Sequence, residues 1–407
     1  MREFDVVIWG ATGFTGRLVA EYLKSQYPDE KDLKWAMAGR NKEKLDEVQR
    51  LTNTEGIPQI IADSNDRDSL SAMTKRTSVI CSTVGPYAKY GSNLVSSCVS
   101  NETHYCDLTG EVQWIRKMID LHHEEAQKKK LKIVHCCGFD SVPSDMGVFF
   151  TQSRIKEAEG QYAESINFYV KAMKGKFSGG TLASLQNVMA EAAEDKSIYK
   201  TLFNPYGLNP KGEMSGPDKI DLVKPKYDQD MKSWLGPFVM AGINTKVVRR
   251  SHALADYPYG DNFRYAETML TGSGLKGRMR ANSLMLTMGM ASAMKPGSIM
   301  KKLGDKFLPK PGEGPTKDER ENGFYNILLL AKLQNGKQRM IKITGDKDPG
   351  YGSTSKMLGE AAVCLIKDQK ELSDHYGCIT PSTAMGEPYL KRLTENAGLT
   401  FELKAEK

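Results

Sequence analysis

The 407-residue sequence lacks an apolar run long enough to cross a membrane. Its longest weakly polar stretch, Ser283–Met294, has about a dozen residues, whereas a spanning helix needs about 20. No basic segment followed by a longer apolar one precedes the first apolar run, so no signal peptide is predicted. We therefore expect a cytoplasmic protein, and a peripheral contact with a membrane surface stays open as an alternative.

Signals for disulfide, metal and hydrolase chemistry are also scarce. The cysteines number seven, an odd count, and no two of them have the Cys-x-x-Cys spacing. The six histidines show no metal-ligand pattern, and the Gly-x-Ser-x-Gly turn of many hydrolases is absent. We predict reduced thiols, no metal site, and no serine hydrolase of that type.

The composition is that of an ordinary globular chain, with 40% hydrophobic and 26% charged residues. The net charge of +7 fits an acidic ligand or partner, and it fits dispersed surface lysines equally well. No nucleic-acid partner is predicted, and the oligomeric state stays open.

Short apolar runs alternate with longer amphipathic segments through residues 1–150. The predicted strands are Phe4–Trp9, Leu33–Ala38, Gln59–Ala62, Ser78–Thr83, Thr103–Cys106 and Leu131–Cys136. Alternation of strands and helices at this spacing is typical of a parallel sheet covered by helices. We therefore predict an α/β fold, with a doubly wound Rossmann domain in residues 1–150.

The rhythm changes after this region. Residues 151–345 are predicted to form a second α/β (α+β) domain that receives the substrate. Its predicted strands are Ile166–Ala172, Lys246–Ser251, Asn262–Thr271, Phe324–Leu333 and Arg339–Thr344. Residues 346–407 are predicted to return to the Rossmann domain, through a Gly/Pro turn at Asp348–Ser353 and a helix at Ser355–Lys367.

The strongest local motif has the spacing Gly-x-x-Gly-x-x-Gly and lies between the first predicted strand and helix. Glycines at these positions permit a tight turn and let the backbone approach a pyrophosphate, while the helix N-terminus offers free N–H groups. The predicted cofactor-binding residues of this turn are Gly10, Ala11, Thr12, Gly13, Phe14, Thr15 and Gly16. The alternative is a glycine turn with a structural role alone.

Three further positions extend the predicted cofactor site. Arg40 follows the second strand, where NAD-preferring proteins usually carry an acid. Its guanidinium suits a 2′-phosphate, which predicts NADPH, although a surface charge at a helix start is the alternative. Asp63 ends the third strand and is predicted to contact the adenine. The loop after the fourth strand places Val84, Gly85 and Pro86 beside the nicotinamide.

Several motifs resemble the saccharopine dehydrogenase-like oxidoreductases, and most closely their trans-acting enoyl reductase branch. The matching segments are Gly10–Gly16, Ala38–Arg40, Thr83–Gly91, His104–Glu111, Cys137–Gly147, Phe177–Thr181, Gly312–Pro315, Asp348–Ser353 and Thr380–Glu387. The resemblance implies NADPH-dependent reduction of an unsaturated acyl or polyketide thioester, which a carrier protein can hold. Saccharopine reductases themselves have an Asp-Pro-Gly turn where this chain has Asp140–Pro143, so lysine metabolism is not implied.

Candidate substrate residues gather after the fourth and sixth predicted strands, at the carboxyl edge of the sheet where ligands bind. They are Tyr87, Asp140, Ser141, Ser144 and Asp145. Tyr87 or Ser141 is the predicted group beside the enolate oxygen of the substrate. Capping of a helix by the serine and aspartate side chains is the alternative.

The stretch Gly272–Pro311 interleaves methionines with eight basic residues and one acid. This composition predicts an apolar groove or helix with a positive rim, which receives an acyl chain, a carrier or an anionic membrane. A methionine-rich core with basic flanks is the alternative. A membrane-associated NADP-binding protein without enoyl reductase activity is the competing functional hypothesis.

Overall fold

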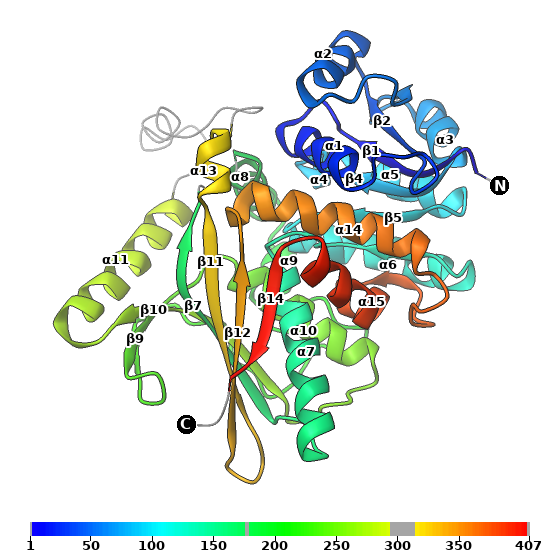
Figure 1. Cartoon of the computed structure of the whole chain (residues 1–407). Coiled ribbons are helices and arrows are strands. Elements are labelled where there is room, and N and C mark those ends of the chain that lie inside the picture. Colours follow the sequence, from blue (N-terminus) through cyan, green and yellow to red (C-terminus); the bar gives the residue numbers. More distant parts are fainter. Residues whose placement is uncertain (1, 176–178, 294–313, 405–407) are drawn as a thin grey trace.

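The computed structural model describes residues 2–175, 179–293 and 314–404. Two seven-stranded sheets lie in this part of the chain, with helices between and around them (Figure 1). In the first sheet the strand order is β13-β6-β5-β4-β1-β2-β3, and neighbouring strands of the described residues pair in parallel. Apart from the added β13, this is the doubly wound order predicted from the sequence.

Most residues in the strands of the first sheet are buried, as expected for a sheet covered on both faces, whereas Ile61 at the end of the edge strand is exposed. They are β1 (Phe4–Trp9), β2 (Trp35–Gly39), β3 (Gln59–Ile61), β4 (Thr77–Ser82), β5 (His104–Asp107), β6 (Lys132–Val134) and β13 (Gly377–Ile379). The helices that alternate with them are α1 (Phe14–Gln26), α2 (Lys42–Thr52), α3 (Arg67–Lys75), α4 (Tyr87–Tyr90), α5 (Ser92–Ser100) and α6 (Val112–Lys128). The Rossmann-type fold is therefore confirmed.

The second sheet is mixed. In order, its strands are β14 (Leu399–Leu403), β12 (Gln338–Gly345), β11 (Phe324–Lys332), β7 (Ser165–Lys174), β10 (Arg264–Gly272), β9 (Ser233–Gly236) and β8 (Lys226–Asp228). The pair β7–β10 is parallel, and the other pairs of neighbouring strands in this sheet are antiparallel. The prediction that the second part of the fold contains both strands and helices is thus confirmed.

The helices that follow β6 in the sequence pack between the sheets or on their outer sides (Figure 1). They are α7 (Val142–Glu159), α8 (Gly179–Glu194), α9 (Ser197–Phe203), α10 (Ala241–Leu254), α11 (Gly274–Ala293), α13 (Lys317–Glu321), α14 (Thr354–Lys367) and α15 (Pro381–Glu395), with the π-helical turn η1 (Pro349–Ser353) before α14. Among the described residues no helix is long and apolar enough to span a bilayer.

The predicted strand Lys246–Ser251 is wrong, because these residues lie inside α10. The prediction took two valines flanked by basic residues as an alternating strand. The two arginines are instead buried and bonded to distant carbonyls: Arg250 donates to the carbonyl oxygens of Leu208 and Cys378 (both 2.5 Å). Since these partners are far along the chain, no local pattern could have revealed them.

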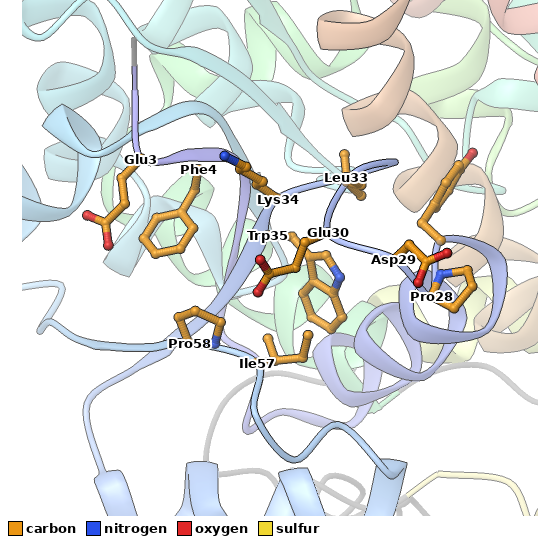
Figure 2. Close-up of a pocket in the computed structure, with 11 residues that line it drawn as sticks. Glu3, Phe4, Pro28, Asp29, Glu30, Leu33, Lys34, Trp35, Ile57 and Pro58 are labelled. Atoms are coloured by element: carbon orange, nitrogen blue, oxygen red, sulfur yellow. The ribbon is translucent and has the colours of Figure 1, made fainter.

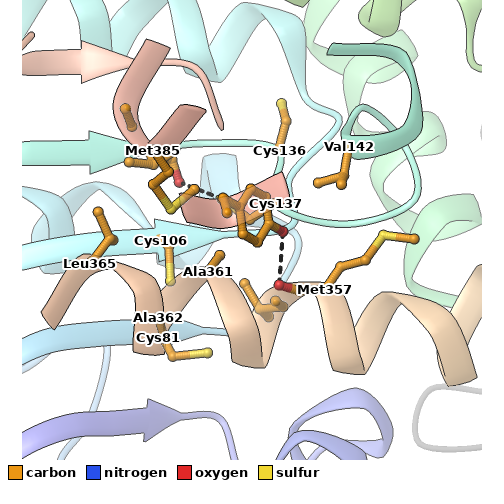
Figure 3. Packing of buried hydrophobic residues seen from close by; sticks show 14 of the residues in the cluster. Cys81, Cys106, Cys136, Cys137, Val142, Met357, Ala361, Ala362, Leu365 and Met385 are labelled. Carbon is orange, nitrogen blue, oxygen red and sulfur yellow. Dashed lines mark hydrogen bonds between the residues drawn. The ribbon is translucent and has the colours of Figure 1, made fainter. Parts of the chain in front are cut away.

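The C-terminal segment contributes to both sheets. Its helix α14 packs against α1, β1, β4 and β5, while β13 pairs with β6 and β14 pairs with β12. Figure 3 shows Ala361 and Ala362 of α14 beside Cys81 and Cys106 in the core that results. All seven cysteines are buried free thiols. The domain limits at 150 and 345 stay predictions.

Candidate active site

The turn between β1 and α1 depends on close backbone packing at two of its glycines. Gly10 has φ of +88°, and a Cβ atom there would lie 2.4 Å from Cγ2 of Val84. A Cβ atom on Gly16 would lie 2.2 Å from the carbonyl oxygen of Gly10. Thr83 fixes the same turn from the next strand, because its hydroxyl lies 3.1 and 3.2 Å from the carbonyl oxygens of Trp9 and Gly10. Gly10 and Gly16 are therefore required by the fold itself.

The middle glycine is different. A Cβ atom on Gly13 would contact only the Gly10 carbonyl oxygen, at 3.3 Å, and Gly13 is exposed. It is also the N-cap residue of α1, and no side chain caps that helix. The backbone N–H groups at the start of α1 thus remain open to an anion.

The other residues of the turn divide between the interior and the surface. Ala11 is fully buried and donates its N–H to the Ala38 carbonyl oxygen at 3.2 Å, whereas Thr12 and Thr15 are partly exposed. The ring of Phe14 packs edge-on against Tyr351 of η1, with ring centroids 4.7 Å apart. Phe14 therefore joins the turn to the C-terminal segment through its side chain.

Arg40 lies directly after β2, next to this turn. A Cβ atom on its neighbour Gly39 would lie 3.4 Å from Cγ2 of Thr12. Arg40 is exposed and makes no hydrogen bond or ion pair with any described residue. Asp63, at the end of β3, accepts a hydrogen bond from the Asn65 N–H at 2.8 Å, which forms a local turn. The Arg40 guanidinium is thus free to bind a ligand.

The loop after β4 is held by a carboxylate that sequence analysis did not select. Glu111 is buried, and its oxygens accept the N–H groups of Tyr87 and Ala88 (2.7 and 2.9 Å) and the hydroxyl of Ser184 in α8 (2.7 Å). Burial raises the pKa of Glu111. It therefore ties the loop of Val84, Gly85 and Pro86 to α8. The sequence signal that could have identified Glu111 is an acidic residue at the start of the helix that follows β5.

Tyr87 does not present its hydroxyl to a substrate space. Its side chain is 3% exposed, and the hydroxyl donates to the Ser82 carbonyl oxygen at 3.1 Å. Burial raises the pKa of Tyr87 well above its ordinary value. These contacts give Tyr87 a packing role at the base of the loop.

Ser141 and Ser144, at the start of α7, lie in the interior beside the second sheet. The Ser141 hydroxyl donates to Asn244 at 3.2 Å, and Asn244 in turn donates to Glu267 of β10 at 2.9 Å. Ser141 and Ser144 are 0% and 1% exposed. Both serines are therefore enclosed between α7, α10 and β10.

Asp145 bonds α7 to two other helices. Its carboxylate accepts the Ser251 hydroxyl of α10 at 2.5 Å and the Ser382 N–H of α15 at 2.7 Å. Burial raises the pKa of Asp145 to about 6. Asp145, for which helix capping was the alternative prediction, thus connects α7 to α10 and α15.

Asp140 stands apart from this network. Its carboxyl group makes no hydrogen bond or ion pair with any described residue, and it is partly exposed. A Cβ atom on Gly110, in the loop after β5, would lie 3.4 Å from Asp140 Oδ2 and 4.0 Å from Ile243 of α10. Desolvation raises the pKa of Asp140 to about 7. The structure thus places one free carboxyl group where the carboxyl edge of the first sheet meets α10.

A surface pocket of about 200 Å³ lies elsewhere (Figure 2). It is lined by Phe4 at the start of β1, Trp35 at the start of β2, and charged residues of both signs, which include Glu3, Glu30 and Lys34. This is the amino edge of the first sheet, whereas ligands of such sheets bind at the carboxyl edge. The pocket is therefore separate from the candidate site.

Comparison with known proteins decides the family. Residues 6–134 match the saccharopine dehydrogenase NADP-binding domain. A putative trans-acting enoyl reductase of Mycobacterium tuberculosis is 37% identical, over 98% of this chain and 97% of its own length. The trans-acting enoyl reductase of Mycobacterium ulcerans is 34% identical, over 97% and 96%. This chain belongs to the trans-acting enoyl reductase family. The resemblance predicted from the sequence motifs is confirmed.

A solved structure agrees at the level of fold. Apo saccharopine dehydrogenase (L-Glu forming) of Saccharomyces cerevisiae matches 99% of this enoyl reductase family member and 100% of its own chain, with a TM-score of 0.54 and 14% identity. At this identity the likeness shows the shared fold alone.

NADPH is the cofactor of this member of the family, in agreement with the matched NADP-binding domain. The chain fits that cofactor, because the start of α1 is uncapped, Gly13 leaves space before it, and Arg40 is free beside it. A pyrophosphate suits the first two features and a 2′-phosphate suits the third.

Proposed function

We propose that this protein reduces the carbon–carbon double bond of an unsaturated acyl or polyketide thioester. Full-length similarity to the trans-acting enoyl reductases carries this proposal. The free Asp140 carboxyl at the carboxyl edge of the NADP-binding sheet supports it, because this reaction needs a proton donor near the nicotinamide.

The residues that hold the cofactor are proposed from the geometry of the turn. The N–H groups at the start of α1 bind the pyrophosphate, and Gly10 and Gly16 keep the turn close enough for this contact. Arg40 binds the 2′-phosphate, and Asp63 lies at the adenine end. Glu111 keeps the Val84–Pro86 loop in position beside the nicotinamide.

When bound, NADPH supplies a hydride to the β-carbon of the thioester. The protein must then stabilise the enolate oxygen and deliver a proton to the α-carbon. Asp140 is the proposed donor, since its raised pKa keeps a large fraction of the carboxyl protonated at neutral pH. Tyr87 and Ser141 are weaker candidates, because both hydroxyls are buried and bonded to other groups.

Reduction of crotonyl-pantetheine by the purified protein with NADPH tests this function, with the butyryl product identified by mass spectrometry. Asp140→Asn should lower kcat by about 100-fold, a usual effect of losing a general acid. Its affinity for NADPH should stay unchanged, because Asp140 is not among the proposed cofactor ligands. The wild-type kcat should fall as pH rises above about 7, where Asp140 loses its proton.

Asp32→Asn provides the control, because Asp32 is exposed in the loop before β2. It should leave kcat and its pH profile unchanged. An Asp140→Asn protein with full activity would rule out this donor, and the absence of any butyryl product from wild-type protein would contradict the reductase function.

A further inference from the structure

Helix α11 exposes a row of large apolar side chains. Leu275, Met279, Leu286 and Met290 are between 52% and 72% exposed. Their separations of four, seven and four residues place them on one side of the helix, within an arc of about 60° at 3.6 residues per turn. We call these four residues the α11 stripe. Exposure of one apolar residue is ordinary, whereas four in a row form a patch that suits an interaction.

The opposite side of α11 already packs against the second sheet. Gly277 and Ala281 are buried there, and a Cβ atom on Gly236 of β9 would lie 2.8 Å from Leu284 Cδ1. Figure 1 shows α11 along the outer side of this sheet, beside β9 and β10. The stripe is therefore additional to the surface that packs on the sheet. The rest of the predicted stretch Gly272–Pro311, from residue 294 onward, lies outside the described residues.

The charged side chains of α11 itself all have one sign. Lys276 and Arg280 lie along one border and Arg278 lies along the other, and all three are exposed. The guanidinium of Arg278 lies 5.3 Å from the ring centre of Trp234, which holds it against β9. The helix Gly274–Ala293 contains no acidic residue. A complementary partner must therefore present an apolar surface with an acidic rim.

We propose that the α11 stripe docks an acidic acyl carrier domain that delivers the thioester. This inference rests on the proposed function, because a substrate held on a separate carrier needs a docking surface on the reductase. An anionic membrane fits less well. Helices that lie in a membrane interface present a broad apolar face, whereas the inner face of α11 is committed to the sheet and the stripe is narrow.

Two double variants separate the apolar and charged parts of the surface. Met279→Ser with Leu286→Ser removes half of the stripe, and Lys276→Glu with Arg280→Glu reverses its border. All four side chains are exposed, so we expect both proteins to fold. The matched control is Lys117→Glu with Lys128→Glu, an equal charge change at exposed positions of α6.

The probe is a purified acidic acyl carrier protein loaded with a crotonyl group, compared with crotonyl-pantetheine. Each α11 variant should have a kcat/KM for the carrier-bound substrate at least ~10-fold lower than that of wild type. Reduction of crotonyl-pantetheine should proceed at the wild-type rate in both variants. Added salt should weaken the wild-type reaction with the carrier, because the attraction is between exposed charges. The α6 control should behave as wild type with both substrates.

Binding of the fluorescently labelled carrier, measured by anisotropy, tests the docking surface without turnover. If crotonyl-pantetheine is not reduced, the proposed function fails, whereas loss of carrier binding in the α11 variants still supports the docking surface. Equal losses with both substrates, or equal losses in the α6 control, would overturn it. The docking proposal would also be overturned if the α11 variants bound the carrier normally and lost only their affinity for vesicles of phosphatidylglycerol and phosphatidylcholine.

Discussion

At the scale of single residues, the structure separates side chains that are free to bind a ligand from those that are occupied. Arg40 and Asp140 have no partner among the described residues, although neither is far from other polar groups. Tyr87 and Ser141, which look equally suitable in the sequence, are bonded and enclosed. A sequence motif names such residues but does not say whether their polar atoms are already used.

Arg40 is expected to decide the choice between the two nicotinamide cofactors. Arg40→Asp should weaken NADPH binding by at least ~10-fold, because a carboxylate repels the 2′-phosphate that a guanidinium would bind in a fork geometry. NADH binding should improve, since an acid can accept the ribose hydroxyl. Fluorescence titration with both cofactors measures this shift. Lys31→Asp, in an exposed loop position, should change neither affinity, and an unchanged preference in Arg40→Asp would show that Arg40 is a surface charge.

At the scale of elements, the strand, turn and helix at the N-terminus illustrate how three similar glycines have different roles. A Cβ atom on Gly10 would collide with Val84 and one on Gly16 with the Gly10 carbonyl oxygen, whereas a Cβ atom on Gly13 would meet only that carbonyl oxygen, at 3.3 Å. The spacing of the motif was sufficient to predict the turn. Only the distances distinguish the glycines that the fold needs from the glycine that leaves room for a cofactor.

This difference predicts opposite behaviour of two substitutions. Gly13→Val should keep a folded protein and abolish binding of both cofactors, because the side chain would occupy the space before α1. Gly16→Val should lower the free energy of unfolding by several kcal/mol, since its Cβ atom would collide with the Gly10 carbonyl oxygen. Urea unfolding and cofactor titration of both variants measure the two effects. Normal binding by Gly13→Val would mean that the turn has a structural role alone.

At the scale of the whole molecule, the C-terminal segment connects the two sheets. It adds β13 to the first sheet and β14 to the second, and its helices α14 and α15 pack against each other. The carboxyl groups of Asp145, which is buried, and of Asp140, which is partly exposed, lie in the region where α7 and α10 meet. Asp140 has a pKa raised by burial from 3.8 to about 7. Ionisation of such a group opposes folding, so a pH dependence of stability follows.

The contribution of Asp140 to stability should be present at low pH and lost as pH rises. Its carboxyl holds a proton more tightly in the folded state than in the unfolded state. The favourable contribution to stability is therefore complete below about pH 4 and disappears as the pH rises through about 7. The side chain in the Asp140→Asn protein cannot ionise. The free energy of unfolding of this variant, relative to that of wild type, should therefore be higher at pH 8 than at pH 5. Urea unfolding at both pH values measures this difference. If the difference in unfolding free energy between the two proteins stays constant with pH, ionisation of Asp140 does not destabilise the folded state.

The sequence by itself determined the Rossmann-type sheet, the position of its glycine turn, and the family. These follow from local features: apolar periodicity, glycine spacing, and motifs that are contiguous in the chain. It also gave the helix Ser355–Lys367, which the structure places at Thr354–Lys367. Such elements are predictable because the interactions that specify them lie within a few residues of one another.

Only the tertiary structure decided which polar groups are free. Lys246–Ser251 lies in α10, where its two arginines are buried and bond to carbonyl groups that are distant in the sequence. Glu111 acquires its role by joining the N–H of Tyr87 to the hydroxyl of Ser184 in α8. The free carboxyl of Asp140 and the uncovered row on α11 were likewise decided there. Burial and pairing depend on which segments meet in space, and a single sequence does not contain those distances.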